Sequence, residues 1–279
     1  MRPGADLGRW ETHVPGTSCV AVRSYGLFRA VWRLRDSAGA LLSGERRANQ
    51  PPGAGRSDGT MGRRPLKSRG GTDITADPLE SPAIVAFDFD GTITARDSYT
   101  AFLKWRAGPL RYAIGMARLG PAGVSYPFHR DRGRIKAQAT REFLAGVPRQ
   151  QLEEEARAFA KATAQGLLRS DAVATWRWWR AKGATMVIVT ASPDVVVAPF
   201  ARALGADALL GTQLAYDDND RVTGAFACLN CRGDEKVSRL KAHFGEDVRL
   251  AAAYGDTSGD TAMLAIAEEK GYRVFKSKP

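Results

Sequence analysis

Two carboxylates lie two residues apart in the segment Asp88-Phe89-Asp90-Gly91-Thr92, directly after the apolar run at 83–87. Alternate residues of a strand point to the same face, so both side chains would leave the strand end together. Two buried like charges are unfavourable unless a cation or a developing positive centre lies between them. The segment therefore predicts a site that performs chemistry at Asp88 and Asp90.

Three further segments carry matching side chains. An apolar strand ends in Thr190-Ala191-Ser192-Pro193, Lys236 opens a helix, and Gly255-Asp256-Thr257-Ser258-Gly259-Asp260 follows another strand. Singly, each fits an ordinary cap, a solvated lysine or a loop. Together they can hold Mg²⁺, neutralise phosphoryl oxygens with a hydroxyl and an ammonium, and leave one carboxylate free to attack. The set predicts a phosphoryl-transfer site.

Other phosphate and metal sites are disfavoured by spacing. An EF-hand loop counted from Asp88 needs a bidentate Glu at its twelfth position, where Tyr99 stands. A glycine-rich phosphate loop ending in GK[ST] is absent from the sequence. Cys228 and Cys231 have redox or zinc-knuckle spacing, but no second CxxC and no His pair accompany them. Metal or redox use of these cysteines is therefore disfavoured.

The elements that must position these segments predict an α/β fold. Strands are expected at 83–88, 185–190, 208–210, 250–254 and 272–275, and helical periodicity is best at 150–182 and 235–244. Strands alternating with helices indicate a doubly wound, Rossmann-like, mainly parallel sheet that binds ligands beyond the carboxyl ends of its strands. Asp88, Thr190 and Asp256 lie at or just past such ends.

The chain is expected to hold one folded domain over residues 81–279. The segment after its first strand is too long for a simple crossover and predicts an inserted α-helical cap at about 97–183. A hairpin with a polar tip is expected at 214–226. The stretch 44–80 is dense in Gly, Pro, Ser and Arg, so residues 1–80 are expected to be a disordered or misassigned N-terminal extension. The functional chain is expected to begin near Met61, shortly before the folded domain.

Composition is that of an ordinary globular protein of 279 residues, with 44% hydrophobic residues and a net charge of +11. The basic balance favours anionic partners without choosing among them. Three cysteines are too few for a disulfide framework in a chain of this length. No apolar run reaches the ~18 residues of a membrane span, and no secretory signal is evident. A cytoplasmic location is expected.

The four motifs together resemble the haloacid dehalogenase (HAD) superfamily of aspartate-nucleophile phosphatases, over about residues 83–275. The resemblance implies a HAD-like hydrolase fold in which Asp88 attacks phosphorus and forms an aspartyl-phosphate. It implies that Asp90 protonates the leaving alkoxide and then activates the water that hydrolyses the intermediate. Thr190 and Lys236 would bind phosphoryl oxygens.

The same resemblance implies a metal site. Mg²⁺ would lie between the Asp88 carboxylate, the Asp90 main-chain carbonyl and Asp256, while Asp260 would orient the metal shell and Lys236. An acid at position 90 also favours phosphate ester hydrolysis over carbon–halogen chemistry. The predicted activity is therefore that of a magnesium-dependent phosphatase.

Within the superfamily, the segment 92–98 and the position of the cap resemble subfamily IB, which includes phosphoserine phosphatase. Asp97 matches the acidic cap-entry position that contacts the substrate of that enzyme. The runs 190–193 and 255–260 depart from its motifs. With Asn230-Cys231-Arg232-Gly233 they look more like the branch that contains phosphatidylglycerophosphatase C. The implied substrate is a lipid phosphate such as phosphatidylglycerophosphate, with a small metabolite such as phosphoserine as the alternative.

Other residues bear on the substrate. The segment 105–119 is apolar, aromatic and punctuated by arginines, as an interfacial segment would be, although an ordinary cap helix has the same features. Arg134 and Lys136 could reach a second charge of the substrate, but nothing in the sequence directs them there. Trp176 and Trp179 share a helix face and are expected in the core.

The expected partner is a small phosphate ester or a lipid phosphate, the latter with peripheral contact at the inner face of the membrane. No nucleic acid and no obligate protein partner are expected. A third hypothesis is a binding module that keeps the fold without activity. It is disfavoured because all six catalytic and binding positions of the motifs are filled.

Overall fold

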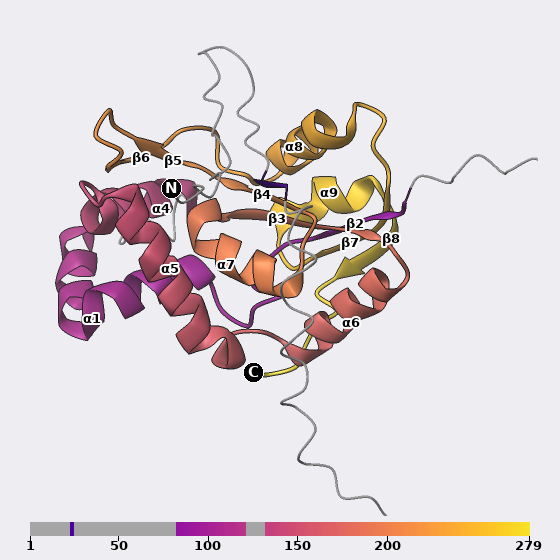
Figure 1. The fold of residues 1–279 in the computed structure, drawn as a ribbon, viewed down its shortest axis with the longest axis horizontal. Helices are drawn as coiled ribbons and strands as arrows, with labels where there is room; N and C mark the ends of the chain where they lie inside the picture. Colours follow the sequence, from indigo (N-terminus) through magenta and orange to yellow (C-terminus); the bar gives the residue numbers. More distant parts are fainter. Residues whose placement is uncertain (1–22, 25–81, 121–131) are drawn as a thin grey trace, which may run out of the picture. The chain divides into compact units, whose positions relative to one another are not determined.

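The computed structural model describes residues 23–24, 82–120 and 132–279 (Figure 1). The extension expected over residues 1–80, including the start near Met61, lies outside the described residues, except for strand β1 (Arg23–Ser24). Strand β1 and residues 82–279 belong to one compact unit.

A sheet with the strand order β1-β4-β3-β2-β7-β8 forms the centre of this unit. Its longer strands are β2 (Ile84–Phe87), β3 (Thr185–Pro193), β4 (Ala208–Thr212), β7 (Leu250–Gly255) and β8 (Ala267–Tyr272). These five are parallel to their neighbours, and only the short β1 pairs antiparallel, with β4. The predicted doubly wound, mainly parallel α/β fold is confirmed. Because parallel strands end at one edge, the segments after β2, β3 and β7 meet there.

Helices cover both faces of the sheet. Val85 and Phe87 of β2 pack in the cluster that contains residues of α6 (Ser170–Ala181) and α7 (Asp194–Leu204). Ala86, between them, faces the opposite cluster, which contains residues of α8 (Asp234–Phe244) and α9 (Thr261–Ala265). This alternation is the period of two expected of a strand buried on both faces.

A helical insertion follows β2 in the sequence. Its described residues form α1 (Ser98–Arg118), α4 (Arg132–Leu144), α5 (Arg149–Thr163) and the short η2 (Ala164–Gly166). Its two connections to the sheet are hydrogen-bonded to each other, since the Ala95 amide donates to Leu167 O and the Arg169 amide donates to Ile93 O. The entry and exit of the insertion are thus fixed side by side.

Aromatic contacts hold the insertion against the rest of the domain. The Phe89 ring lies 5.5 Å from that of Phe200 in α7, which lies 5.9 Å from Phe159 in α5. Phe159 in turn lies 5.4 Å from Phe102 in α1, and all four side chains are buried. Such pairs contribute about 0.5–1.5 kcal/mol each beyond the buried area. The chain of rings begins at the residue between Asp88 and Asp90, so it also fixes that turn.

The last strand differs from the prediction. The strand expected at 272–275 lies instead at β8 (Ala267–Tyr272), and Phe275 packs its ring against Phe87 and Tyr254. β8 is an edge strand, and its exposed residues 268–270 are Glu, Glu and Lys. Charged side chains are usual on edge strands. This strand therefore lacks the run of apolar residues by which the other strands were predicted.

The periodic stretch expected at 150–182 is two helices, α5 and α6. The first of them, α5, ends at Thr163, and the short η2 after it ends at Gly166, in keeping with the low helix propensity of glycine. Leu167 then pairs with the entry of the insertion. The helix expected at 235–244 is confirmed as α8. The hairpin expected at 214–226 is confirmed as β5 (Leu214–Tyr216) and β6 (Val222–Phe226).

Two tryptophans of α6 lie where the shared helix face predicted them. Trp176 is buried, contacts the Phe87 ring at 5.1 Å and donates its indole N–H to Leu204 O. Trp179 is partly buried and donates to the Tyr254 hydroxyl. Among the helices described, none is long and apolar enough to cross a membrane.

Candidate active site

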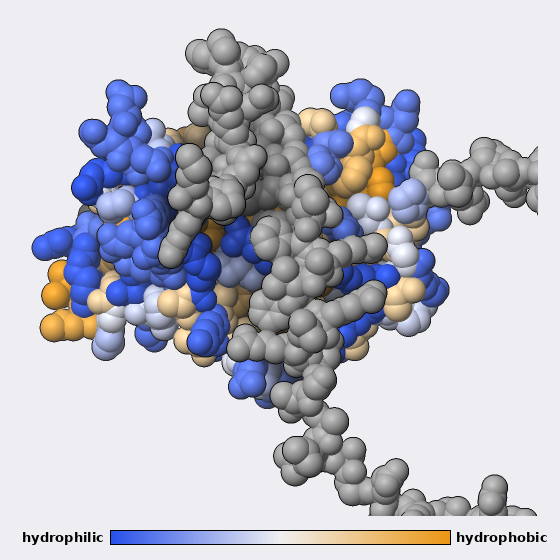
Figure 2. Space-filling view, viewed as in Figure 1, coloured by the Kyte–Doolittle hydropathy of each residue, from blue (hydrophilic) through white to orange (hydrophobic). Residues whose placement is uncertain are grey.

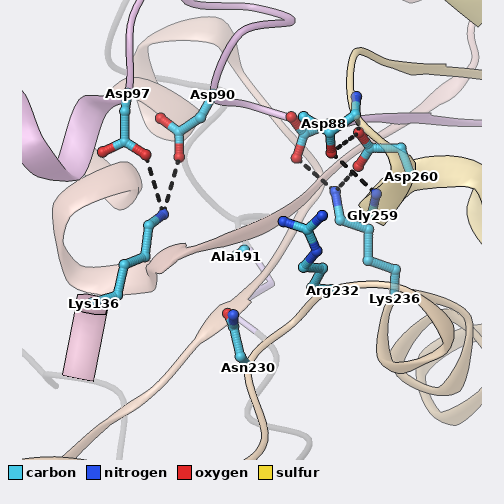
Figure 3. Close-up of a pocket in the computed structure, with 11 residues that line it drawn as sticks. Asp88, Asp90, Asp97, Lys136, Ala191, Asn230, Arg232, Lys236, Gly259 and Asp260 are labelled. Atoms are coloured by element: carbon cyan, nitrogen blue, oxygen red, sulfur yellow. Dashed lines mark hydrogen bonds and ion pairs between the residues drawn. The ribbon is translucent and has the colours of Figure 1, made fainter. Parts of the chain in front are cut away.

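A pocket lies beyond the carboxyl ends of the central strands (Figure 3). Its lining comes from the predicted motifs and from the helical insertion: Asp88, Asp90, Asp97, Lys136, Ala191, Asn230, Arg232, Lys236, Thr257, Gly259 and Asp260. Of the predicted site residues, Thr190 and Asp256 are adjacent to the pocket but are not part of its lining. The topology therefore brings together segments far apart in the sequence.

A buried ion network occupies one end of the pocket. The Lys236 ammonium lies 2.5 Å from Asp88 Oδ1 and 2.7 Å from Asp260 Oδ1. It also donates to Val189 O at 2.7 Å, and its side chain is almost fully buried. A lysine ammonium has three N–H donors, and these three acceptors use them all. A phosphoryl oxygen would have to replace one of these acceptors to bind Lys236.

Burial controls the charges in this network. Burial raises the pKa of Asp88 to about 7, although Lys236 opposes the shift. Burial disfavours the charged form of Lys236, but Asp88 and Asp260 outweigh it and hold the pKa above its usual value. Lys236 therefore stays charged, and a second cation beside Asp88 would favour the carboxylate form of that residue.

Asp90 lies between Asp88 and Asp97 in the pocket (Figure 3). Its Oδ1 accepts from the Ser98 amide at 2.7 Å, and its Oδ2 accepts from the Ser192 hydroxyl. Burial, and then the nearby charge of Asp97, raise the pKa of Asp90. A carboxyl group with a raised pKa is suited to donate a proton near neutral pH.

Lys136 and Ser192 are two residues of the site that sequence reasoning did not place there. The Lys136 ammonium lies 3.2 Å from Asp97 Oδ2, 4.0 Å from Asp90 Oδ2 and 3.2 Å from Ser192 Oγ. Ser192 could have been found as the second hydroxyl of the run at 190–193. Lys136 had no such signal, because α4 brings it in from the insertion. The Arg134 side chain lies outside the described part of the structure.

Asp97 also has a structural role. It caps the first turn of α1, where its Oδ1 accepts from the Thr100 amide at 2.7 Å. Burial opposes ionisation of Asp97, but Lys136 and the Thr100 amide outweigh it and keep the pKa below its usual value. Asp97 is thus a charged side chain of the pocket that Lys136 already neutralises.

An orphaned carboxylate oxygen marks the candidate metal site. Asp256 Oδ1 is buried and has no hydrogen-bond partner within the described part of the chain. Oxygens of Asp88, Asp256 and Asp260 lie within 4.8 Å of one another. Both oxygens of Asp260 already bind protein groups, Oδ1 with Lys236 and Oδ2 with the Thr257 amide and hydroxyl. Because a buried unpartnered carboxylate oxygen is costly, the residues fit a divalent cation between Asp88 and Asp256.

Thr190 and the cysteines make other contacts. Thr190 is fully buried, and its hydroxyl accepts from the Ser192 amide at 3.1 Å. Cys231 is buried beside Leu210 O, and burial raises the pKa of its thiol to about 11. Cys228 accepts from Arg239, so the two thiols have different partners. Both thiols are free.

Comparisons with known proteins define the family. Residues 85–265 match the haloacid dehalogenase-like hydrolase family. The match covers more than half of the chain, so the protein belongs to this family, and the predicted hydrolase class and HAD-like fold are confirmed.

The chain is similar in sequence to one curated relative and in fold to two solved structures. Protein CicA of Caulobacter vibrioides is 62% identical over 206 residues, which are 74% of this chain and 92% of CicA. A protein of unknown function from Bordetella pertussis has a TM-score of 0.58 at 23% identity, covering 67% of this chain and 87% of that chain. A probable phosphoserine phosphatase from Vibrio cholerae has a TM-score of 0.51 at 16% identity, covering 69% of this chain and 56% of that chain.

Proposed function

We propose that the chain is a Mg²⁺-dependent phosphomonoesterase that works through an aspartyl-phosphate on Asp88. The observation that carries this proposal is the pairing of Asp88 with Lys236 next to the orphaned Oδ1 of Asp256, in a pocket that Asp90 also lines. Family membership and the phosphatase named among the structural neighbours agree with it.

Each step of the reaction has a side chain in place. Asp88 attacks phosphorus, and the bond from phosphorus to the ester oxygen breaks as Asp90 protonates the leaving alkoxide. Asp90 then takes a proton from water as that water attacks the phosphoenzyme, which releases inorganic phosphate and restores Asp88. Asp88, Asp256 and the Asp90 carbonyl would hold Mg²⁺. When bound, the ion would neutralise phosphoryl charge and favour ionised Asp88.

Gly91→Ala should weaken Mg²⁺ activation by about tenfold or more, on the scale of changes around metal ligands. Gly91 has a φ of +84°, and a Cβ there would lie 2.2 Å from Asp256 Oδ2, so the carboxylate must move. The control is Gly146→Ala, whose φ is +78° with nothing within 4 Å of the added Cβ. Titrations of activity and of protein stability with Mg²⁺ should be unchanged in the control. Equal Mg²⁺ dependence in both variants would argue against a metal ligand at Asp256.

Asp90→Asn should convert turnover into a single burst. With p-nitrophenyl phosphate the leaving group needs little protonation, so Asp88 still attacks, but an amide does not activate the hydrolytic water. We expect one equivalent of p-nitrophenolate per enzyme, followed by very slow release of phosphate in stopped-flow measurements. Sustained turnover at the wild-type rate would show that Asp90 is not the acid–base residue.

For the substrate, we propose a lipid phosphate such as phosphatidylglycerophosphate, hydrolysed by a cytoplasmic protein of subfamily IB at the membrane surface. The supporting observation is that apolar side chains of α1 are exposed: Leu110 to 75%, and Trp105 and Ile114 to more than 40%. Figure 2 shows apolar surface over α1, at the left of the view. The helical insertion would act as the cap, since α4 delivers Lys136 to the pocket.

A second candidate is a soluble metabolite such as phosphoserine. Asp97 and Lys136 present one carboxylate and one ammonium to the pocket, the pair of charges that could recognise an amino acid. The test is Mg²⁺-dependent phosphate release from phosphatidylglycerophosphate and phosphatidic acid in detergent and in vesicles, and from phosphoserine, sugar and nucleotide phosphates in buffer. Activity on the lipids alone supports the first candidate, and full activity on phosphoserine in plain buffer excludes it.

A further inference from the structure

Arg232 is a charged side chain of the pocket to which the proposed function gives no role. It follows β6 in the loop that leads to α8, and its guanidinium is directed toward Asp88 and Lys236 (Figure 3). Among the described residues, the guanidinium makes one hydrogen bond, from Nη2 to the Ser258 hydroxyl at 3.2 Å. A guanidinium has five N–H donors, so most of its donors are available to a ligand.

The other cations of the pocket are already engaged. Lys236 uses all three N–H donors on Asp88, Asp260 and Val189 O. Lys136 contacts Asp97 and Ser192, at the end of the pocket away from Asp88 (Figure 3). Among the cationic side chains that line the pocket, Arg232 is therefore the one with most of its donors available to an anion that reaches Asp88.

The loop that carries Arg232 is held in place from several sides. The Thr212 hydroxyl lies 3.1 Å from Asn230 Oδ1 and accepts from the Cys231 amide at 3.0 Å. The buried Arg239 donates to Leu229 O at 2.6 Å, and the Gly233 amide donates to Gly259 O at 2.8 Å. The guanidinium is thus presented from a prearranged backbone, which lowers the entropic cost of binding a ligand.

The Arg232 side chain packs closely over Gly259, where any side chain would collide with it. A Cβ on residue 259 would lie 2.7 Å from Arg232 Cγ and 2.9 Å from its Nε. Any other residue at 259 would force the arginine out of this position. The absence of a side chain at residue 259 therefore lets Arg232 line the pocket.

We propose that Arg232 binds non-bridging oxygens of the reacting phosphoryl group, a contact that the sequence motifs assign only to Thr190 and Lys236. The proposal rests on the proposed phosphomonoesterase function. Guanidinium groups bind phosphate through paired, charge-assisted hydrogen bonds, which an ammonium reproduces only in part.

The test uses inorganic phosphate as the probe, with the full chain and Mg²⁺, in calorimetric titration and in competitive inhibition. Arg232→Gln should weaken phosphate binding by about tenfold or more, since charge-assisted hydrogen bonds are lost. The phosphate affinity of Arg232→Lys should lie between those of the wild type and Arg232→Gln. Arg157→Gln is the matched control, because Arg157 is exposed on α5 and is not part of the pocket lining. It should bind phosphate as the wild type does.

A measurement of Mg²⁺ affinity separates direct binding from support of the loop at 256–260. Arg232→Gln with weakened phosphate binding and unchanged Mg²⁺ affinity is the expected result. Unchanged phosphate binding, or an equal loss of Mg²⁺ affinity, would overturn the role of Arg232. If the wild type itself neither binds phosphate nor hydrolyses any monoester, the proposed function fails as well. If the wild type hydrolyses monoesters and Arg232→Gln binds phosphate with unchanged affinity, only the role of Arg232 is refuted. The proposed phosphomonoesterase function then stands.

Discussion

Asp88→Asn should abolish phosphate release, lowering the turnover rate by at least about 10³-fold, as expected when a nucleophile is removed. An amide is not a nucleophile toward phosphorus, and the carboxylates of Asp90 and Asp260 are held by other groups. The oxygens of Asp90 accept hydrogen bonds from Ser98 and Ser192. Those of Asp260 bind Lys236 and accept from Thr257. The measurement is the initial rate of phosphate release at saturating Mg²⁺, compared between the wild type and Asp88→Asn.

The variant should remain folded, which makes the loss of activity interpretable. The substituted asparagine keeps the shape of the side chain and an oxygen for Lys236, and burial already disfavours the charged form of Asp88. Asp234→Asn, which makes the same chemical change at an exposed position in the first turn of α8, is the control and should keep full activity. Wild-type rates in Asp88→Asn would refute the aspartyl-phosphate mechanism.

Lys236→Met should lower the free energy of unfolding by about 3–5 kcal/mol, as for loss of one partner of a buried ion pair. Methionine fills much of the same volume but leaves Asp88 and Asp260 without their shared cation, and Val189 O without a donor. Asp88, whose pKa is already about 7, would then take up a proton, while Asp260 stays charged through its bonds from Thr257. Denaturant titration with an unchanged m-value gives the difference.

Lys241→Met on the same helix is the control for this substitution. Lys241 lies 3.3 Å from Glu246, and the two side chains are 40% and 82% exposed. Exposed ion pairs contribute about 0–1 kcal/mol, so the control should unfold almost like the wild type. An equal loss of unfolding free energy in both variants would show that the buried ion network of Lys236 does not stabilise the fold more than an exposed ion pair does.

The strand ends were predictable because of how parallel sheets bury their strands. Runs of apolar residues at 84–87, 186–189 and 250–254 mark strands buried on both faces, and the first polar residue after each run must lie at the sheet edge. Asp88 and Asp256 were found in this way. Lys236 was placed in the same site because its ammonium completes the chemistry of the four segments, but its direct contact with Asp88, 148 residues away, was not predicted.

Long-range placement explains what the sequence did not predict. Lys136 reaches the pocket through the packing of α4 in the insertion, and Arg232 reaches it because residue 259 is a glycine. Neither fact has a local pattern in the sequence. Strand β8 was misplaced for a related reason, since pairing with β7, rather than apolar character, makes it a strand.

The most direct test of the account is to locate the phosphoryl group on the protein. Wild-type, Asp90→Asn and Asp88→Asn proteins would be mixed with p-nitrophenyl phosphate and Mg²⁺, quenched in acid, digested and analysed by mass spectrometry. The aspartyl-phosphate mechanism predicts a phosphorylated peptide that contains Asp88, abundant in Asp90→Asn and absent in Asp88→Asn. Phosphate release by the wild type, with no phosphorylated peptide at Asp88 in any of the three proteins, would contradict it.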